Sequence, residues 1–255
     1  MTFPLRSTAA CAALLAALWT GAAPAQENAT ARPPVVAPGL NAVIEKSEPA
    51  GWSSVKDIDA LTDPKALTAA QGKWWRDEAR RMQALPAGGA LKAARSGPVL
   101  MLALRGGRAL KLFDQGVPGA GLHEGDRFHT LAGASPAAGH YVVQVSMNEF
   151  EFHWLVSHAT GAMASVPAKP VFTPDAARAF GFRDELMNGR ELGVVALTPE
   201  GGTPEKVEWK PGDEPDVKFE LRWAPDGQAI LVSETRAGKR VDYRLARRDG
   251  AWRRQ

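Results

Sequence analysis

Histidines are the residues of this chain that most readily suggest a metal or acid–base site, and there are five of them. His123 and His129 lie six residues apart in a glycine-rich stretch, whereas a zinc-binding helix needs its two histidines four residues apart on one face. His153 and His158 differ by an odd number of residues, so one continuous strand would direct them to opposite faces. His140 stands alone at the start of a predicted strand. We therefore predict no metal site and interpret the histidines as scattered surface or loop residues.

Two other patterns could support hydrolysis. Ser53 and Lys56 match the Ser-x-x-Lys spacing of a serine–lysine nucleophile, but the accompanying Ser-Asp-Asn and Lys-Thr-Gly elements are absent from the sequence. Glu149 and Glu151 would lie about 6.6 Å apart on one strand face, which suits paired-carboxylate chemistry, although a half-solvated strand predicts the same spacing. We therefore predict no catalytic residue and no cofactor. A cell-envelope polymer hydrolase, with its site in residues 114–139, is kept as an alternative.

Basic residues concentrate in residues 236–255, where eight Lys and Arg accompany two Asp. Such a cluster could meet anionic envelope polymers or lipid headgroups. The alternative is a solvated edge strand whose charges discourage pairing with another sheet. The predicted binding residues of this cluster are Arg240, Arg244, Arg247 and Arg248.

The tandem tryptophans Trp74 and Trp75 lie in a predicted helix. Helical spacing puts Trp75 on an apolar stripe with Ala79 and Met82, so we predict Trp75 in the core. Trp74 points about 100° away from that stripe. It is therefore a further candidate binding residue, as a stacking platform, and the alternative is that it covers a sheet edge.

The first 25 residues have the layout of a secretory signal peptide. Arg6 is the only charge before residue 27, an apolar run occupies residues 12–19, and small residues end at Ala25. We expect cleavage after Ala25 and a periplasmic or secreted mature chain without a transmembrane segment. An uncleaved anchor is the alternative, but a spanning helix needs about 20 strongly apolar residues.

Cys11 is the only cysteine and lies inside this segment, so we expect a mature chain with neither a disulfide nor a thiol catalyst. A lipid anchor at Cys11 would leave the apolar run in the mature chain, so none is predicted. The formal net charge of +3 is small for 255 residues. This balance argues against general nucleic-acid binding.

Composition divides the rest of the chain into three parts. Residues 26–50 are rich in Ala and Pro and are predicted to form a flexible linker. Residues 51–96 are predicted to hold one helix, which begins at a Thr-Asp-Pro cap at 62–64. Residues 97–255 show period-two alternation and are predicted to form an antiparallel β domain, in which residues 114–139 are a long loop.

Two segments of the β domain, 170–182 and 220–232, match at an offset of 51 residues. Each contains an aromatic residue, a Pro-Asp turn and an apolar strand. Proline fixes φ for the turn, and the aspartate side chain can bond to the backbone two residues further on. The predicted turn residues are Pro174, Asp175, Pro225, Asp226 and Gly227.

The sequences Phe-Thr-Pro-Asp and Trp-Ala-Pro-Asp-Gly resemble the aromatic-Ser-Pro-Asp-Gly turn of TolB-type, WD-like β-propeller blades. The pattern extends over roughly residues 97–252, but the strict match is two turns of about 13 residues each, and the first has Ala176 where glycine is usual. At about 40 to 45 residues per blade, the region would hold three to four blades. TolB-type propellers act as periplasmic interaction modules, so the resemblance implies a protein or cell-wall-associated partner.

We therefore predict a mainly β fold of antiparallel meander repeats resembling a small or partial β-propeller, with one N-terminal helix. The predicted function is a non-catalytic periplasmic or secreted binding or scaffold protein, with an envelope protein or an anionic cell-wall polymer as partner. A polymer hydrolase and a structural domain without a ligand are the alternatives. A binding protein should present an exposed apolar patch, whereas a hydrolase should bring acid and base together in a pocket.

Overall fold

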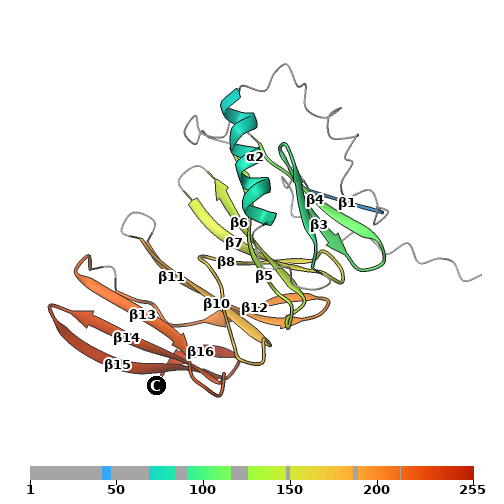
Figure 1. Ribbon diagram of the computed structural model, residues 1–255. Coiled ribbons are helices and arrows are strands. Elements are labelled where there is room, and N and C mark those ends of the chain that lie inside the picture. Colours follow the sequence, from blue (N-terminus) through green and yellow to red (C-terminus); the bar gives the residue numbers. More distant parts are fainter. Residues whose placement is uncertain are drawn as a thin grey trace, which may run out of the picture. The chain divides into compact units, whose positions relative to one another are not determined.

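The computed structural model describes residues 42–46, 69–83, 91–115, 126–147, 150–185, 189–212 and 214–255. Strands account for most of these residues, because branched and aromatic side chains recur along them and suit a pleated, half-buried surface. The strands form three sheets in the described part of the chain (Figure 1). The predicted signal peptide lies outside the described residues, as do Ser53, Lys56, His123 and Glu149.

The first sheet has the strand order β1-β4-β3-β2. Its strands are β1 (Ala42–Lys46), β2 (Ala93–Ser96), β3 (Val99–Leu104) and β4 (Arg108–Phe113). β3 and β4 form the predicted hairpin, whose turn holds Gly106 and Gly107 at positive φ of 77° and 69°. The structure differs from the predicted boundaries, because β1 falls inside the expected linker and β2 precedes residue 97, yet both pair within this sheet.

The second sheet is an antiparallel meander in the order β5-β6-β7-β8. Its strands are β5 (Phe128–Ser135), β6 (His140–Met147), β7 (Phe150–Ser157) and β8 (Met163–Val166). The prediction of a loop over residues 114–139 is wrong for β5. A bulge between Leu131 and Gly133 shifts its register against β6, and this bulge and small side chains hide the period-two pattern.

The helix α2 (Ala69–Gln83) lies beside the first sheet and turns one face to the protein interior. Trp75 and Met82 are buried, as their spacing predicted. Glu78 is also buried on this face, and its carboxylate pairs with Arg81 at 2.7 Å. Within the described ranges, no helix is long and apolar enough to cross a membrane.

The third sheet has eight strands in the order β13-β14-β15-β16-β12-β11-β10-β9. It consists of two four-stranded meanders joined by a short parallel pairing of Lys206 with Ala251 and of Val207 with Trp252. The first meander is β9 (Val171–Phe172), β10 (Arg178–Glu185), β11 (Gly189–Thr198) and β12 (Gly201–Val207). The second is β13 (Val217–Trp223), β14 (Ala229–Arg236), β15 (Lys239–Arg248) and β16 (Ala251–Arg254).

Aromatic rings cover one face of this third sheet, which we call the aromatic face. Neighbouring rings lie 5.3 to 6.3 Å apart, mostly tilted or edge-to-face, an arrangement that aromatic pairs favour. The rings belong to Phe180, Phe182, Trp209, Phe219, Trp223, Tyr243 and Trp252.

The two Pro-Asp turns have the same backbone hydrogen bonds at an offset of 51 residues. In the first, Thr173 N–H donates to Arg178 O and Ala177 N–H to the Asp175 carboxylate. In the second, Ala224 N–H donates to Ala229 O and Gln228 N–H to the Asp226 carboxylate. The predicted turn chemistry is therefore present in both copies.

The two turns also meet in space. Gly227 approaches Thr173 and Pro174, and the Trp223 indole N–H donates to Val171 O at 2.8 Å. These contacts bring the two edge strands, β9 and β13, together. The eight-stranded sheet is therefore nearly closed and barrel-like.

The mainly β class with antiparallel meanders and a helix before them is confirmed. The propeller-like arrangement stays a prediction. Blades of a propeller are separate four-stranded sheets, whereas the β9–β12 and β13–β16 meanders share one sheet here.

Three glycines let the third sheet pack closely against residues 164–168, which comprise the end of β8 and the two residues after it. Gly181 and Gly193 are direct partners on β10 and β11, and Gly202 lies on β12. A Cβ atom on Gly181 would lie 2.5 Å from the carbonyl oxygen of Ala168, well inside van der Waals contact. Only glycine permits this approach of two backbones.

Replacement of Gly181 tests this packing. We expect Gly181→Ala to lower the free energy of unfolding by about 1–3 kcal/mol, because the added methyl group meets backbone that cannot move aside cheaply. Chemical denaturation measures this change. Thr203→Ala, at an exposed position of β12, is the control and should change stability by less than about 0.5 kcal/mol. Equal stability of the two variants would contradict the close approach.

A reciprocal pair of substitutions tests the repeated turn. Ala176 and Gly227 occupy equivalent positions at φ of 57° and 66°, a region that costs an L-residue roughly 1–2 kcal/mol. We expect Gly227→Ala to destabilise the protein by about 1 kcal/mol. Ala176→Gly should be neutral or stabilising, because relief of strain opposes the added freedom of the unfolded chain. Thermal unfolding of both variants measures the pair, and a change of the same size and sign in both would refute the equivalence.

Candidate functional site

β15 carries the four arginines that the sequence singled out near the C-terminus, and its pairing decides where each side chain points. Leu245 is fully buried opposite Ile230 in the core beneath the aromatic face. Side chains alternate along a strand, so Arg247 shares the face of Leu245. Arg240, Arg244 and Arg248 therefore belong to the opposite face, and all three are exposed.

The opposite side of β13–β16 forms a basic face. Cross-strand register places Arg222 of β13, Leu231 of β14 and Arg244 of β15 in one row. Further rows pair Lys218 with Thr235 and Arg240, and Ala246 with Arg253. The same face carries two carboxylates, Glu220 and Asp242, in one row with Ser233. We define the basic face by its cations, which outnumber them and are Lys218, Arg222, Arg240, Arg244, Arg248 and Arg253.

Two of these cations already have carboxylate partners. The Arg240 guanidinium lies 2.9 Å from Asp242, and the Ser233 hydroxyl donates to the same carboxylate at 2.6 Å. Hydrogen bonds from Ser233 and Arg240 lower the pKa of Asp242. Arg253 pairs with Glu208 at 2.6 Å. These two arginines therefore contribute less net positive charge than their number suggests.

Arg222, Arg244 and Arg248 differ, because no carboxylate in the described part of the chain lies within 4.0 Å of their nitrogens. Arg222 and Arg244 are separated by two strand spacings, about 10 Å, and Arg244 and Arg248 by four residues of strand, about 13 Å. These cations are therefore spread both across the strands and along β15. Their spacing suits an extended polyanion that crosses the strands.

Arg247 does not join the basic face. Its Nε atom lies 3.3 Å from the carboxylate of Glu205, which is almost fully buried on the aromatic face. Glu205 also accepts the indole N–H of Trp252 at 2.8 Å and lies 3.4 Å from Arg178. A buried carboxylate needs such partners, so the structure gives Arg247 a structural contact.

Trp74, the other predicted binding residue, is covered by its own chain. Its ring lies 5.8 Å from the ring of Phe128, and the guanidinium of Arg95 lies 5.6 Å from the indole centroid. The indole is only partly exposed. These contacts favour a packing role for Trp74 over an open stacking platform.

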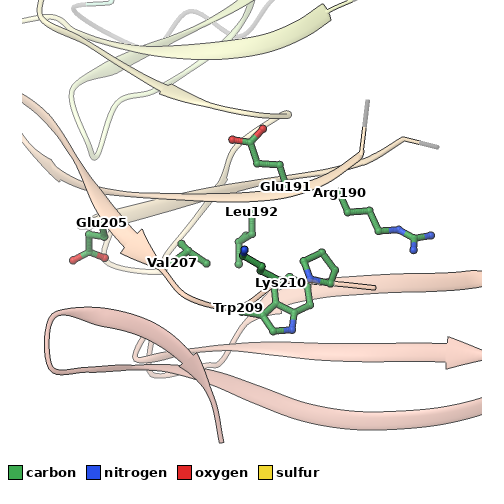
Figure 2. A pocket seen from close by; sticks show the side chains of 8 residues that line it. Arg190, Glu191, Leu192, Glu205, Val207, Trp209 and Lys210 are labelled. Carbon is green, nitrogen blue, oxygen red and sulfur yellow. The ribbon is translucent and has the colours of Figure 1, made fainter. Parts of the chain in front are cut away.

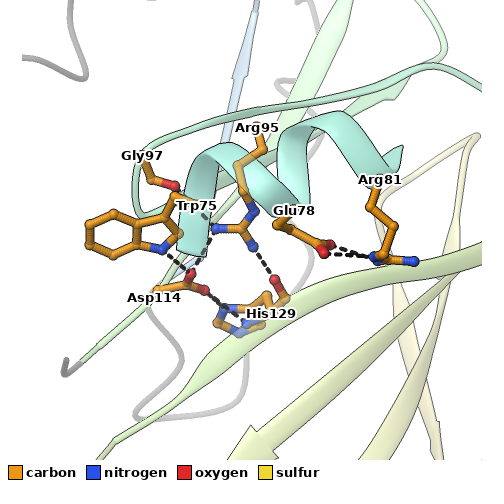
Figure 3. Close-up of polar contacts among 7 residues, drawn as sticks. All are labelled: Trp75, Glu78, Arg81, Arg95, Gly97, Asp114 and His129. Carbon is orange, nitrogen blue, oxygen red and sulfur yellow. Dashed lines mark hydrogen bonds and ion pairs between the residues drawn. The ribbon is translucent and has the colours of Figure 1, made fainter. Parts of the chain in front are cut away.

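An aspartate–histidine pair lies beneath α2 and has the composition of a catalytic dyad (Figure 3). The Asp114 carboxylate lies 3.1 Å from His129 Nδ1 and accepts the His129 backbone N–H at 2.8 Å. Arg95 and the Trp75 indole N–H also bond to it, at 2.7 and 3.0 Å. Four donors thus converge on one carboxylate.

The burial of this cluster indicates a structural role and argues against a role in proton transfer. The side chains of Asp114 and Arg95 have no exposed surface. Burial lowers the pKa of His129, and the hydrogen bond that its ring donates to Asp114 opposes that effect without overcoming it. The cluster joins α2 to residues of the first two sheets, which is its evident role.

The interpretation of the histidines as surface or loop residues is wrong for three of them. His129, His140 and His153 lie on strands and are buried. For His140 and His153, sequence alternation missed this because neighbouring positions of β6 and β7 are buried on both sides of the sheet. His129 lies on β5, which the sequence predicted as a loop. Among the described residues, no three His, Cys, Asp or Glu side chains could hold a metal ion. Glu151, half of the suggested carboxylate pair, is exposed on β7.

The sequence also missed Lys218, Arg222 and Arg253 as members of the basic face. The basic cluster begins at residue 236, which is 18 residues after Lys218 and 14 residues after Arg222, and only strand pairing brings these two residues beside it. Neither protein-family models nor curated proteins match this chain.

Substitution of Asp114 tests whether this buried cluster stabilises the fold. We expect Asp114→Asn to lower the free energy of unfolding by about 3–5 kcal/mol, because buried Arg95 would lose its only neutralising partner among the contacts described. Chemical denaturation measures the loss. Asp77→Asn removes an exposed carboxylate from α2 and should cost less than about 1 kcal/mol. A variant at position 114 as stable as this control would contradict the structural role.

Proposed function

We propose that this chain is a non-catalytic binding protein of the periplasm or cell exterior, and that its partner is an anionic cell-wall polymer held on the basic face. The observation that carries the proposal is a set of three exposed arginines on one face of β13–β16, Arg222, Arg244 and Arg248, none of which has a carboxylate within 4.0 Å among the described residues. The export-type leader predicted from residues 1–25 supports the compartment.

Long-range electrostatics favour this kind of partner. A flat row of cations gains little from one bound ion, since each exposed pair contributes less than about 1 kcal/mol. A polymer engages several cations at once, so these small contributions accumulate along one molecule. Half-buried Leu231 lies between Arg222 and Arg244, and the neighbouring side chains of Ala229 and Ala246 are small and buried, so little bulk obstructs a chain lying across the strands.

The resemblance to TolB-type interaction modules supports the same class of function. Its two turns are built alike, and they lie at the edge where β9 and β13 meet. We propose that they stabilise the sheet that carries the basic face. The patch expected from the sequence was apolar, whereas the one that supports this proposal is cationic.

A triple substitution tests the proposal. Arg222→Gln, Arg244→Gln and Arg248→Gln together should weaken binding to immobilised poly(glycerol phosphate) on the order of 100-fold at low salt, at about 1 kcal/mol for each cation near a polyanion. Binding of the unchanged protein should also weaken as salt rises, because exposed charges are screened. Biolayer interferometry measures both effects, with uncharged dextran as the reference polymer.

The control lowers the net charge by the same amount elsewhere. Lys73→Gln, Arg76→Gln and Lys92→Gln are exposed and lie outside β13–β16. This control should keep its affinity within about twofold, a change of less than 0.5 kcal/mol. Equal losses in the two triple variants would show that net charge alone drives adsorption, and an absence of binding by the unchanged protein would reject the polymer as partner.

A further inference from the structure

The strands β11 and β12 separate part of the way along their length. Their ladder runs from Thr198 and Gly201 to Val194 and Glu205 and then ends. β11 continues to Gly189 against β10, while β12 turns to pair with β16. A gap therefore opens inside the eight-stranded sheet.

This gap is a cavity of about 460 Å³ with an apolar floor and a charged rim. Leu192, Val207 and Trp209 point into the space between the two strands (Figure 2). The ring of Trp209 packs against the rings of Phe182, Phe219 and Tyr243, which hold it in place. The rim carries Lys210, which is exposed.

The backbone of β11 has free hydrogen-bonding groups on this side. The N–H of Leu197 donates to Ala177 O at 2.8 Å, on the side of β10. Backbone groups of successive residues in an antiparallel strand point to alternate sides, so those of Leu192 and Arg190 point toward β12. Both residues lie beyond the end of the β11–β12 ladder, and no backbone partner for them occurs within the described residues.

One end of this opening is bordered by the side chain of Arg190, which is held in place by several bonds. The guanidinium of Arg190 donates to the carbonyls of Glu214 at 2.9 Å and Val217 at 2.6 Å, and its Nε pairs with Asp184 at 2.6 Å. These bonds tie the segment after Trp209 to β11. The Arg190 end of the cleft is thus bordered by groups that are already bonded to one another.

We propose that this cleft accepts an extended peptide, which adds to β11 as a strand beside Arg190 and Leu192. Strand addition satisfies unpaired backbone groups and places alternate side chains in pockets. One apolar side chain of the peptide packs on Leu192, Val207 and Trp209. An acidic side chain lies beside Lys210, since the other charged residues that line the pocket already have partners. Glu191 pairs with Arg183 at 2.6 Å, Arg190 with Asp184 at 2.6 Å, and Glu205 with Arg247 at 3.3 Å.

This peptide site is separate from the basic face and does not depend on the polymer. Leu192, Val207 and Trp209 belong to the aromatic side of the sheet, and the arginines of the basic face belong to the other side. A volume of about 460 Å³ falls in the range typical of small-ligand sites, which fits a short segment and not a folded domain.

The test uses the whole protein and a defined probe, the blocked pentapeptide acetyl-Val-Glu-Val-Glu-Val-amide, with binding measured by calorimetry. A second peptide of the same sequence carries N-methyl groups on alternate amides, which removes backbone donors without changing charge. We expect the parent peptide to bind and the N-methylated peptide to bind at least about tenfold more weakly. Equal affinities, or no binding of the parent peptide at millimolar concentration, would overturn the proposal.

Charge exchange at the rim provides the second readout. Lys210→Glu should weaken binding of the acidic peptide by about fivefold and improve binding of a peptide with lysine in place of glutamate. Lys92→Glu, at an exposed lysine outside both proposed surfaces, is the matched control and should leave both affinities unchanged. Equal effects of the two substitutions would overturn placement of the peptide beside Lys210. We also expect Lys210→Glu to leave binding of poly(glycerol phosphate) unchanged, which would show that the peptide site and the basic face act independently.

Discussion

Burial of Leu245, Ile230 and Trp252 in the core of the aromatic face is the constraint on which the proposed binding surface depends. Because side chains alternate along a strand, fixing Leu245 inward also fixes Arg244 outward. A slip of one residue in β15 would expose Leu245 and bury Arg244, at a cost that the aromatic core makes large. The positions of the outward arginines are thus set by apolar packing on the other side of the sheet.

The same core explains the neighbouring charges. Glu205 is buried among the rings and requires the Trp252 indole and two arginines to compensate its desolvation. Arg247 is one of these two arginines, whereas the side chain of Arg248, the next residue, belongs to the opposite face of the sheet. Beneath α2, the buried carboxylate of Asp114 is compensated in the same way, by hydrogen bonds from Arg95 and the Trp75 indole. In both places a buried carboxylate is satisfied by an indole N–H and a guanidinium, and each contact joins separate elements of the chain.

Local signals in the sequence predicted local structure well. The Pro-Asp turns, the Gly-Gly hairpin and the buried side of α2 follow from turn chemistry and helical spacing, which need no tertiary information. Composition alone singles out Arg244 and Arg248 as members of a basic cluster. The separation of Arg247 from them was not, because it depends on which face of β15 meets the rings. Arg222, the Asp114 cluster and the opening between β11 and β12 arise from pairing between distant segments, and no local pattern marks them.

Protection of arginines from chemical modification tests the central claim most directly. Mass spectrometry after treatment with phenylglyoxal, with and without poly(glycerol phosphate), reports which guanidinium groups the polymer covers. The account predicts protection of Arg222, Arg244 and Arg248 and unchanged reactivity of Arg76 on α2. Uniform protection of all exposed arginines, or protection confined to residues outside β13–β16, would contradict it.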